Sequence, residues 1–159
     1  RDLKIVPVAI SYEWDPCDID KSKQLLEEAS GTSLLKSERD DLQAMEKGLL
    51  GHNGRIEVSF GRPISANEHT PLNHYEVANR VDEFIHANSH LFPSHYAAHQ
   101  TLEGQLAFGC PYSVIELAKA KVLLDKRLED EPEDVKNGVY MAYAAPVKSK
   151  LANQKQDVS

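Results

Sequence analysis

The chain has 159 residues, of which 41% are hydrophobic and 27% charged, a composition typical of one globular domain. Its formal net charge of −7 argues against nucleic acid as a partner, because binding to phosphate backbones needs a basic surface. No apolar run reaches the roughly 18 to 20 residues that cross a bilayer, so any membrane contact is expected to be peripheral. Two widely separated cysteines, Cys17 and Cys110, predict free thiols and a cytoplasmic protein.

The first predicted element is a strand over residues 5–12. Its β-branched and aromatic residues form a continuous run that ends at Trp14-Asp15-Pro16, which indicates a turn. Both faces of the run are apolar. This pattern is typical of a strand inside a parallel sheet that helices cover on both sides.

Two helices and a second strand are predicted next. Apolar residues recur at helical spacing over residues 20–29 and 37–50. Residues 55–60 alternate apolar and polar side chains, which predicts a strand with one apolar face. If the two strands are neighbours, this strand–helix–strand order predicts a parallel pair.

The rest of the chain is predicted to be helical. Thr70 and Pro71 are typical of a helix start, and this helix is expected to reach residue 91. Pro93 is expected to break it, and Ser94 to cap a shorter successor through about residue 106. Two more helices are predicted over residues 112–129 and 133–143, and the polar chain from residue 148 is expected to fray.

The predicted fold class is therefore α/β: the remnant of a mostly parallel sheet, with two strands joined through helices, followed by a helical C-terminal half. Residues 1–64 form the α/β part, residues 65–147 a helical extension packed on it, and residues 148–159 a polar tail. Two strands make a poor sheet alone. We therefore expect the other neighbours of the first strand to lie upstream of Arg1, in a larger domain.

Two stretches, KIVPVAI at residues 4–10 and RIEVSFGRPI at residues 55–64, point to a family. The first resembles the fourth motif of the glycerophospholipid acyltransferases, the group that contains bacterial lysophosphatidic acid acyltransferase. The second resembles the strand that follows it in that family. Three further segments are similar to one bacterial branch of the family: SYEWDPCD, ANSHLFPSHYAA and YAAPVKSK, at residues 11–18, 87–98 and 143–150.

The resemblance implies an enzyme of phospholipid biosynthesis. It would transfer an acyl group from acyl-CoA or acyl carrier protein to a lysophospholipid or glycerol phosphate, without a metal or redox cofactor. Its implied location is the cytoplasm, with peripheral contact at the inner face of the membrane. The implied substrate-binding residues form part of an acyl-binding wall: Ile5, Val6, Pro7, Val8, Ala9 and Ile10.

The catalytic residues of the family are missing from this chain. In the family, the histidine of an Asn-His-x-x-x-x-Asp motif acts as general base on the acceptor hydroxyl, and the aspartate orients that histidine. None of the seven histidines here is followed by aspartate five positions later. Arg62 also stands where many relatives have glutamate. The segment is therefore predicted to be inactive alone, with the catalytic motif in a missing N-terminal half of the same polypeptide.

Two other functions fit the sequence. His95, His99 and Glu103 follow one another at intervals of four residues on a predicted helix, so they share a face. Two imidazoles and a carboxylate with an open position suit zinc, and this predicts a metal-dependent enzyme as one alternative. The other alternative is a non-catalytic interaction or regulatory module, whose binding surface lies on the helices between residues 71 and 143.

Overall fold

The computed structural model describes residues 4–31, 38–51, 53–64 and 73–156 of the chain. Contacts divide the chain into two compact units, and each is made of two separate stretches of sequence. The first unit combines Arg1–Tyr12 with Ile56–His90, and the second combines Glu13–Arg55 with Leu91–Ser159. The chain thus alternates between the units, and the predicted boundaries after residues 64 and 147 stay a prediction.

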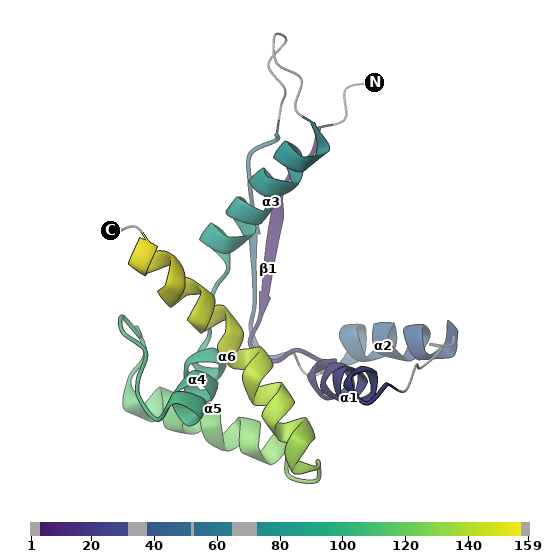
Figure 1. The fold of residues 1–159 in the computed structure, drawn as a ribbon, viewed down its shortest axis with the longest axis vertical. Helices are drawn as coiled ribbons and strands as arrows, with labels where there is room; N and C mark the ends of the chain where they lie inside the picture. Colours follow the sequence, from purple (N-terminus) through teal and green to yellow (C-terminus); the bar gives the residue numbers. More distant parts are fainter. Residues whose placement is uncertain (1–3, 32–37, 52, 65–72, 157–159) are drawn as a thin grey trace. The chain divides into compact units, whose positions relative to one another are not determined.

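In its described residues, the first unit has a two-stranded sheet and one helix. Strand β1 (Val8–Tyr12) pairs with strand β2 (Ile56–Phe60) in antiparallel register, with Ile10 opposite Val58. Helix α3 (His74–Asn88) packs on β1 and lies along it in Figure 1. Both predicted strands are confirmed, and the mixed α/β class with them. The prediction that the strands are parallel was wrong.

The antiparallel direction follows from how the chain returns after its first two helices. In the second unit, the backbone N–H of Glu13 donates to the carbonyl of Arg55 at 2.9 Å, and that of Trp14 donates to Asn53 at 3.2 Å. The chain therefore comes back at the point where it left β1. A crossover helix would instead carry the chain back to the start of β1, and the second strand would then run parallel to the first. Because the chain returns at the end of β1, the second strand runs in the opposite direction.

Helix α3 is shorter than the predicted helix over residues 71–91. Asn73 caps it: its side-chain oxygen accepts from the backbone N–H groups of Tyr75 and Glu76, each at 3.0 Å. The Glu76 carboxylate in turn accepts from the Asn73 N–H at 2.9 Å, which completes a capping box. The predicted cap, Thr70 with Pro71, lies outside the described residues.

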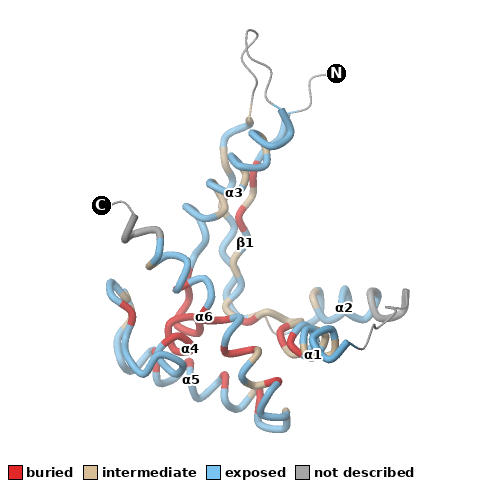
Figure 2. The backbone as a smooth tube through the Cα atoms, in the orientation of Figure 1, coloured by how far each residue is buried: buried red, intermediate tan, exposed pale blue. Residues whose placement is uncertain are grey.

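The second unit consists of helices. They are α1 (Asp18–Ala29), α2 (Glu38–Leu50), α4 (Pro93–Glu103), α5 (Val114–Arg127) and α6 (Glu133–Gln156). Helix α6 packs on both α1 and α4, and α4 also packs on α5. Figure 2 shows the buried residues in red where α4 and α6 lie together. The core there is formed by side chains from the loop before α1 and from α4, α5 and α6: Trp14, Ala98, Leu124, Leu128, Val139, Tyr140, Tyr143 and Ala144.

A glycine allows α1 and α6 to approach closely. A Cβ atom added at Gly138 on α6 would lie 2.1 Å from the Ser22 hydroxyl oxygen on α1. That hydroxyl donates to the carbonyl of Val135 at 2.9 Å, so it ties α1 to the first turn of α6. Glycine normally weakens a helix interior, and here the close packing of two helices explains its presence.

Three expectations about helix ends were wrong. Pro93 does not lie between helices but occupies the first position of α4, where its missing N–H costs no hydrogen bond. Ser94 is not the cap; its hydroxyl donates to the carbonyl of Glu13 at 2.8 Å. The helix predicted to end at residue 143 continues through Pro146 to Gln156 as part of α6.

Packing explains why α6 continues past the proline. Val147, one residue after Pro146, is 1% exposed and packs in a cluster with Leu91, Tyr96 and Leu117. Burial of this kind outweighs the cost of a proline in a helix, about 3 kcal/mol. The expected fraying from residue 148 is therefore wrong for residues 148–156. In the part of the chain that the structure describes, no helix combines the length and apolarity needed to cross a bilayer.

Candidate functional site

The two strand motifs that carry the family resemblance lie side by side in the first unit. The backbone N–H of Gly61 donates to the carbonyl of Pro7 at 2.9 Å, and that of Ile64 donates to Ile5 at 2.7 Å. A Cβ atom added at Gly61 would lie 2.6 Å from Pro7 Cγ and 2.9 Å from Phe84 Cε2 on α3. Gly61 is thus required where the two motifs and α3 meet.

Replacement of Gly61 by alanine is expected to lower the stability of the first unit by about 1–3 kcal/mol, because the added methyl group has no space. We expect faster hydrogen exchange at the β1 and β2 amides, measured under native conditions. Gly48 is the matched control, since a Cβ added there in helix α2 meets no atom within 4 Å. Gly48→Ala should leave exchange in β1 and β2 unchanged; equal effects of both substitutions would contradict the packing argument.

The sheet has one covered and one open face. Pro7 and Ala9 are buried on the side that α3 covers. Side chains directly opposite one another in the register share a face, and the other face is apolar throughout. Its exposed members, with 38–73% of their surface accessible, are Val6, Ile10, Tyr12, Ile56, Val58 and Phe60. The first strand was expected to be covered on both faces, and in the described residues only one face is covered.

This division splits the residues implied for the acyl-binding wall. Val6, Val8 and Ile10 point to the open face, whereas Pro7 and Ala9 are buried on the opposite side. Ile5 forms an isolated antiparallel bridge with Ile64 beside the strands. Only the side chains at positions 6, 8 and 10 are therefore placed to form a continuous apolar surface.

Two of the three residues considered for a metal site have other contacts. His95 Nδ1 accepts from the backbone N–H of Phe92 at 2.8 Å, and Glu103 forms an ion pair with Lys148 at 2.6 Å. This lysine lowers the pKa of Glu103, chiefly through its hydrogen bond. His99 is 6% exposed, and its Nδ1 has no hydrogen-bond partner among the described residues. Across the described residues, no group of three or more His, Cys, Asp or Glu side chains is arranged to hold a metal ion.

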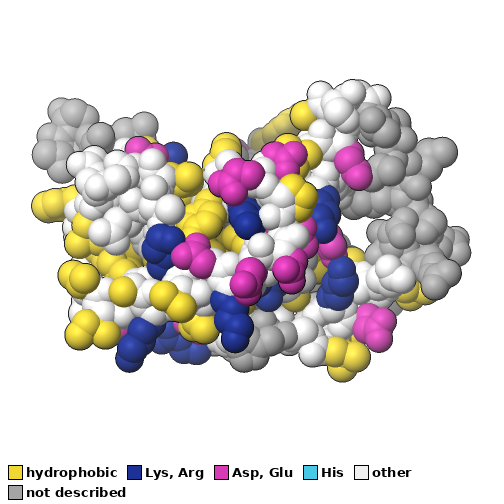
Figure 3. All heavy atoms as spheres, turned by 90° about the horizontal axis from the view of Figure 1, so that it is seen from below, with side chains coloured by type: hydrophobic (Ala, Val, Ile, Leu, Met, Phe, Trp, Pro, Cys, Tyr) yellow, Lys and Arg dark blue, Asp and Glu magenta, His cyan; other side chains and the backbone are white. Residues whose placement is uncertain are grey.

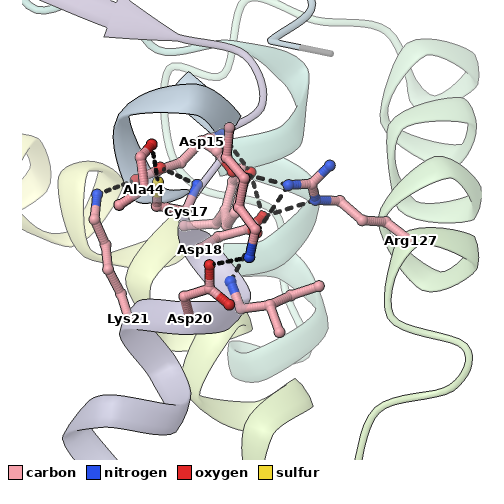
Figure 4. Close-up of polar contacts among 10 residues, drawn as sticks. Asp15, Cys17, Asp18, Asp20, Lys21, Ala44 and Arg127 are labelled. Carbon is pink, nitrogen blue, oxygen red and sulfur yellow. Dashed lines mark hydrogen bonds and ion pairs between the residues drawn. The ribbon is translucent and has the colours of Figure 1, made fainter. Parts of the chain in front are cut away.

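A buried ion pair in the second unit was not predicted from the sequence. The Asp18 side chain, at the start of α1, is 2% exposed. Arg127, at the end of α5, donates to both carboxylate oxygens, from Nε and from Nη2, each at 2.9 Å. Figure 4 shows the guanidinium of Arg127 turned toward Asp18 and Asp15. Bidentate pairs of this kind are both strong and geometrically specific.

Tyr143 on α6 completes this cluster. Its hydroxyl donates to Asp18 Oδ2 at 3.0 Å and accepts from the backbone N–H of Asp15 at 2.9 Å. Burial raises the pKa of Tyr143 far above its usual value, so the phenol stays protonated as a donor. The backbone N–H of Ile19 also donates to Asp18 Oδ1, at 2.8 Å. Each Asp18 carboxylate oxygen therefore accepts two hydrogen bonds. Because the Asp18 carboxylate accepts four hydrogen bonds, we interpret the cluster as a structural connection between α1, α5 and α6.

Residues from the three further segments noted in the sequence, 11–18, 87–98 and 143–150, meet in the core around this cluster. Trp14 is 6% exposed, and its ring lies 6.2 Å from that of Tyr143, centroid to centroid. Ser94, in the middle segment, is fully buried and bonds to Glu13 in the first segment. Residues separated by more than a hundred positions thus form one packed centre. The sequence offered no local signal for it, because no periodicity or spacing links Asp18 to Arg127.

The described residues define a mixed α/β protein with a two-stranded antiparallel sheet and a group of packed helices. In comparisons with known proteins, no family model, curated protein or solved structure matches the chain. Two features of the structure bear on function: the contact between the strand motifs at Pro7 and Gly61, and the open apolar face of the sheet formed by β1 and β2.

Proposed function

We propose that the chain is the C-terminal part of a bacterial acyltransferase of phospholipid biosynthesis. The complete enzyme transfers an acyl group from acyl-CoA or acyl carrier protein to a lysophospholipid or glycerol phosphate. Its catalytic histidine and aspartate belong to the N-terminal part of the same polypeptide. The enzyme works in the cytoplasm, peripherally at the inner face of the membrane.

The observation that carries the proposal is the open apolar face of the sheet. Helix α3 covers only one face of the two strands, and a strand with apolar residues on both faces is typical of the inside of a larger sheet. Within the described residues β1 and β2 pair only with each other. In the complete enzyme, further strands would extend the sheet, and the acyl chain together with further helices would cover this face, where Ile10, Val58 and Phe60 are now 44–73% exposed.

In the proposed reaction this chain contributes apolar surface and no proton transfer. The histidine of the N-terminal part takes the proton of the acceptor hydroxyl, and the oxygen attacks the thioester carbonyl. The thiol of the donor leaves and the ester remains on the acceptor. Val6, Val8 and Ile10 line the side along which the acyl chain lies, where burial of its methylene groups provides binding energy.

The test begins with the reading frame upstream of Arg1, which should encode a His-x-x-x-x-Asp motif. The complete gene product is expected to transfer radiolabelled acyl groups from acyl-CoA to lysophosphatidic acid or glycerol phosphate. Residues 1–159 alone are expected to show no transfer. Ile10→Asp in the complete protein should reduce transfer by about tenfold or more, because it places an unpaired charge on a buried apolar surface.

Leu25→Asp is the matched control, since Leu25 is 65% exposed on α1 and lies outside the sheet. It should leave transfer close to the wild-type rate. An upstream frame without the motif would overturn the proposal. Saturable acyl transfer by residues 1–159 alone would do the same.

A further inference from the structure

Helix α5 has an apolar outer face besides its buried one. Leu117, Ala120 and Leu124 point into the core and are at most 5% exposed. On the opposite side of the helix, Ile115 and Val122 are 67% and 64% exposed. Residues at this spacing lie on one stripe of a helix, about 180° from the buried one.

Two lysines lie on the same stripe. Lys119 and Lys126 follow Ile115 and Val122 by four residues each, so they project beside them, and both are exposed. Neither lysine forms an ion pair with any residue that the structure describes. Figure 3 looks onto the lower side of Figure 1, where α5 lies, and apolar, basic and acidic side chains are interspersed there.

The acidic side chains of α5 are used elsewhere. Glu116 accepts from the backbone N–H and the hydroxyl of Ser113, at 2.8 and 2.7 Å, and so caps the helix. Asp125 pairs with Lys121 at 2.6 Å and accepts from the hydroxyl of Tyr140 on α6. The outer stripe therefore carries two positive charges and no carboxylate.

An exposed aromatic residue precedes the helix. Phe108 is 88% exposed, whereas its neighbour Ala107 is 5% exposed and packs in the core. The backbone N–H of Cys110 donates to the carbonyl of Ala107 at 3.2 Å, and Gly109 has a left-handed φ of 71°. A closed turn thus holds the Phe108 side chain out into solvent.

We propose that the outer stripe of α5 (Ile115, Lys119, Val122 and Lys126), together with Phe108, docks on the surface of an anionic phospholipid bilayer. Isoleucine, valine and phenylalanine side chains enter the boundary between headgroups and acyl chains, as in other interfacial helices. The lysine ammonium groups reach the lipid phosphates while their aliphatic stems remain among the apolar groups. The docking depends on this surface and not on acyl transfer.

The two lysines of the stripe, which form no ion pair with a described residue, argue for an anionic bilayer as the occupant. The whole chain carries a net charge of −7, so a negatively charged surface repels most of the molecule. Only a local surface that combines positive charge with apolar side chains can overcome this repulsion. Binding is therefore expected to weaken as salt screens the lysines, and to be much weaker on neutral lipid.

The test is sedimentation of the 159-residue chain with vesicles of phosphatidylcholine, with and without phosphatidylglycerol. We expect binding to the anionic vesicles, and about fivefold weaker partitioning for each lysine of the stripe that is removed, about 25-fold for Lys119→Gln with Lys126→Gln. Lys23→Gln with Lys47→Gln is the matched control, because it changes the net charge equally on other helices. The control should bind like the wild type.

A second readout reports insertion of the turn. Trp14 is buried, so a tryptophan introduced by Phe108→Trp is the exposed reporter, and its emission should shift to the blue and be quenched by brominated lipids. Equal binding to neutral vesicles, no binding, or an equal loss in the control pair would overturn the proposal. A blue shift that appears without lipid as protein concentration rises would assign the surface to a second copy instead, and would also overturn it.

Discussion

Asp18→Ala is expected to lower the free energy of unfolding by about 3–5 kcal/mol, the cost of removing one partner of a buried ion pair. The substitution leaves the Arg127 guanidinium, whose side chain is 26% exposed, without its bidentate acceptor. It also removes the acceptor of the Tyr143 hydroxyl and of the Ile19 N–H. The loss should be measured by urea denaturation followed by circular dichroism.

Asp20 provides a matched control two residues further along α1. It pairs with Lys47, but its side chain is 48% exposed, so Asp20→Ala should cost less than about 1 kcal/mol. Asp18→Ala combined with Arg127→Met should recover part of the loss, since no unpaired buried charge then remains. Similar costs for the two aspartates would show that the buried pair does not hold α1 to α5.

Leu124→Ala is expected to cost about 2–5 kcal/mol, because the leucine is completely buried and its truncation leaves a cavity. Its neighbours in the core include Ala98 on α4 and Val139 on α6, so three helices contribute to the same site. These helices hold one another in place. The cost should therefore appear in a single unfolding transition of the second unit.

The adjacent residue makes a close control. Leu123 is 55% exposed on the same helix, and Leu123→Ala should change stability by no more than about 0.5 kcal/mol. The two variants share helix propensity and composition, so their difference isolates burial. Thermal and urea unfolding of both proteins measure it, and comparable losses would mean that α5 does not pack through its Leu117, Ala120 and Leu124 side.

Most of the secondary structure could be predicted from the sequence. Apolar periodicity located α1, α2, α5 and both strands to within a few residues, because side-chain patterns repeat with the geometry of the backbone. The caps were harder. Asn73 and Ser113 each begin a capping box, but Thr70 and Ser94 match the same residue preferences, and Ser94 bonds instead to Glu13.

The candidate sites differ in how far the sequence could indicate them. The strand motifs were recognisable as residue strings, and the structure brings Pro7 and Gly61 into contact. The split of residues 5–10 between a buried and an open face was not predicted, because both faces are equally apolar in sequence. The outer stripe of α5 was also missed, since its apolar residues cannot be told from core residues until Leu117 and Leu124 are known to be the buried ones.

By itself the sequence determined the approximate positions of most helices and of both strands, and that the second strand has one apolar face. Only the tertiary structure decided the direction of the two strands, the continuation of α6 through Pro146 and the pairing of Asp18 with Arg127. The physical reason is one of range. A helix or strand depends on side chains a few residues apart, whereas these three features depend on contacts between residues far apart in the chain, and local patterns carry no record of them.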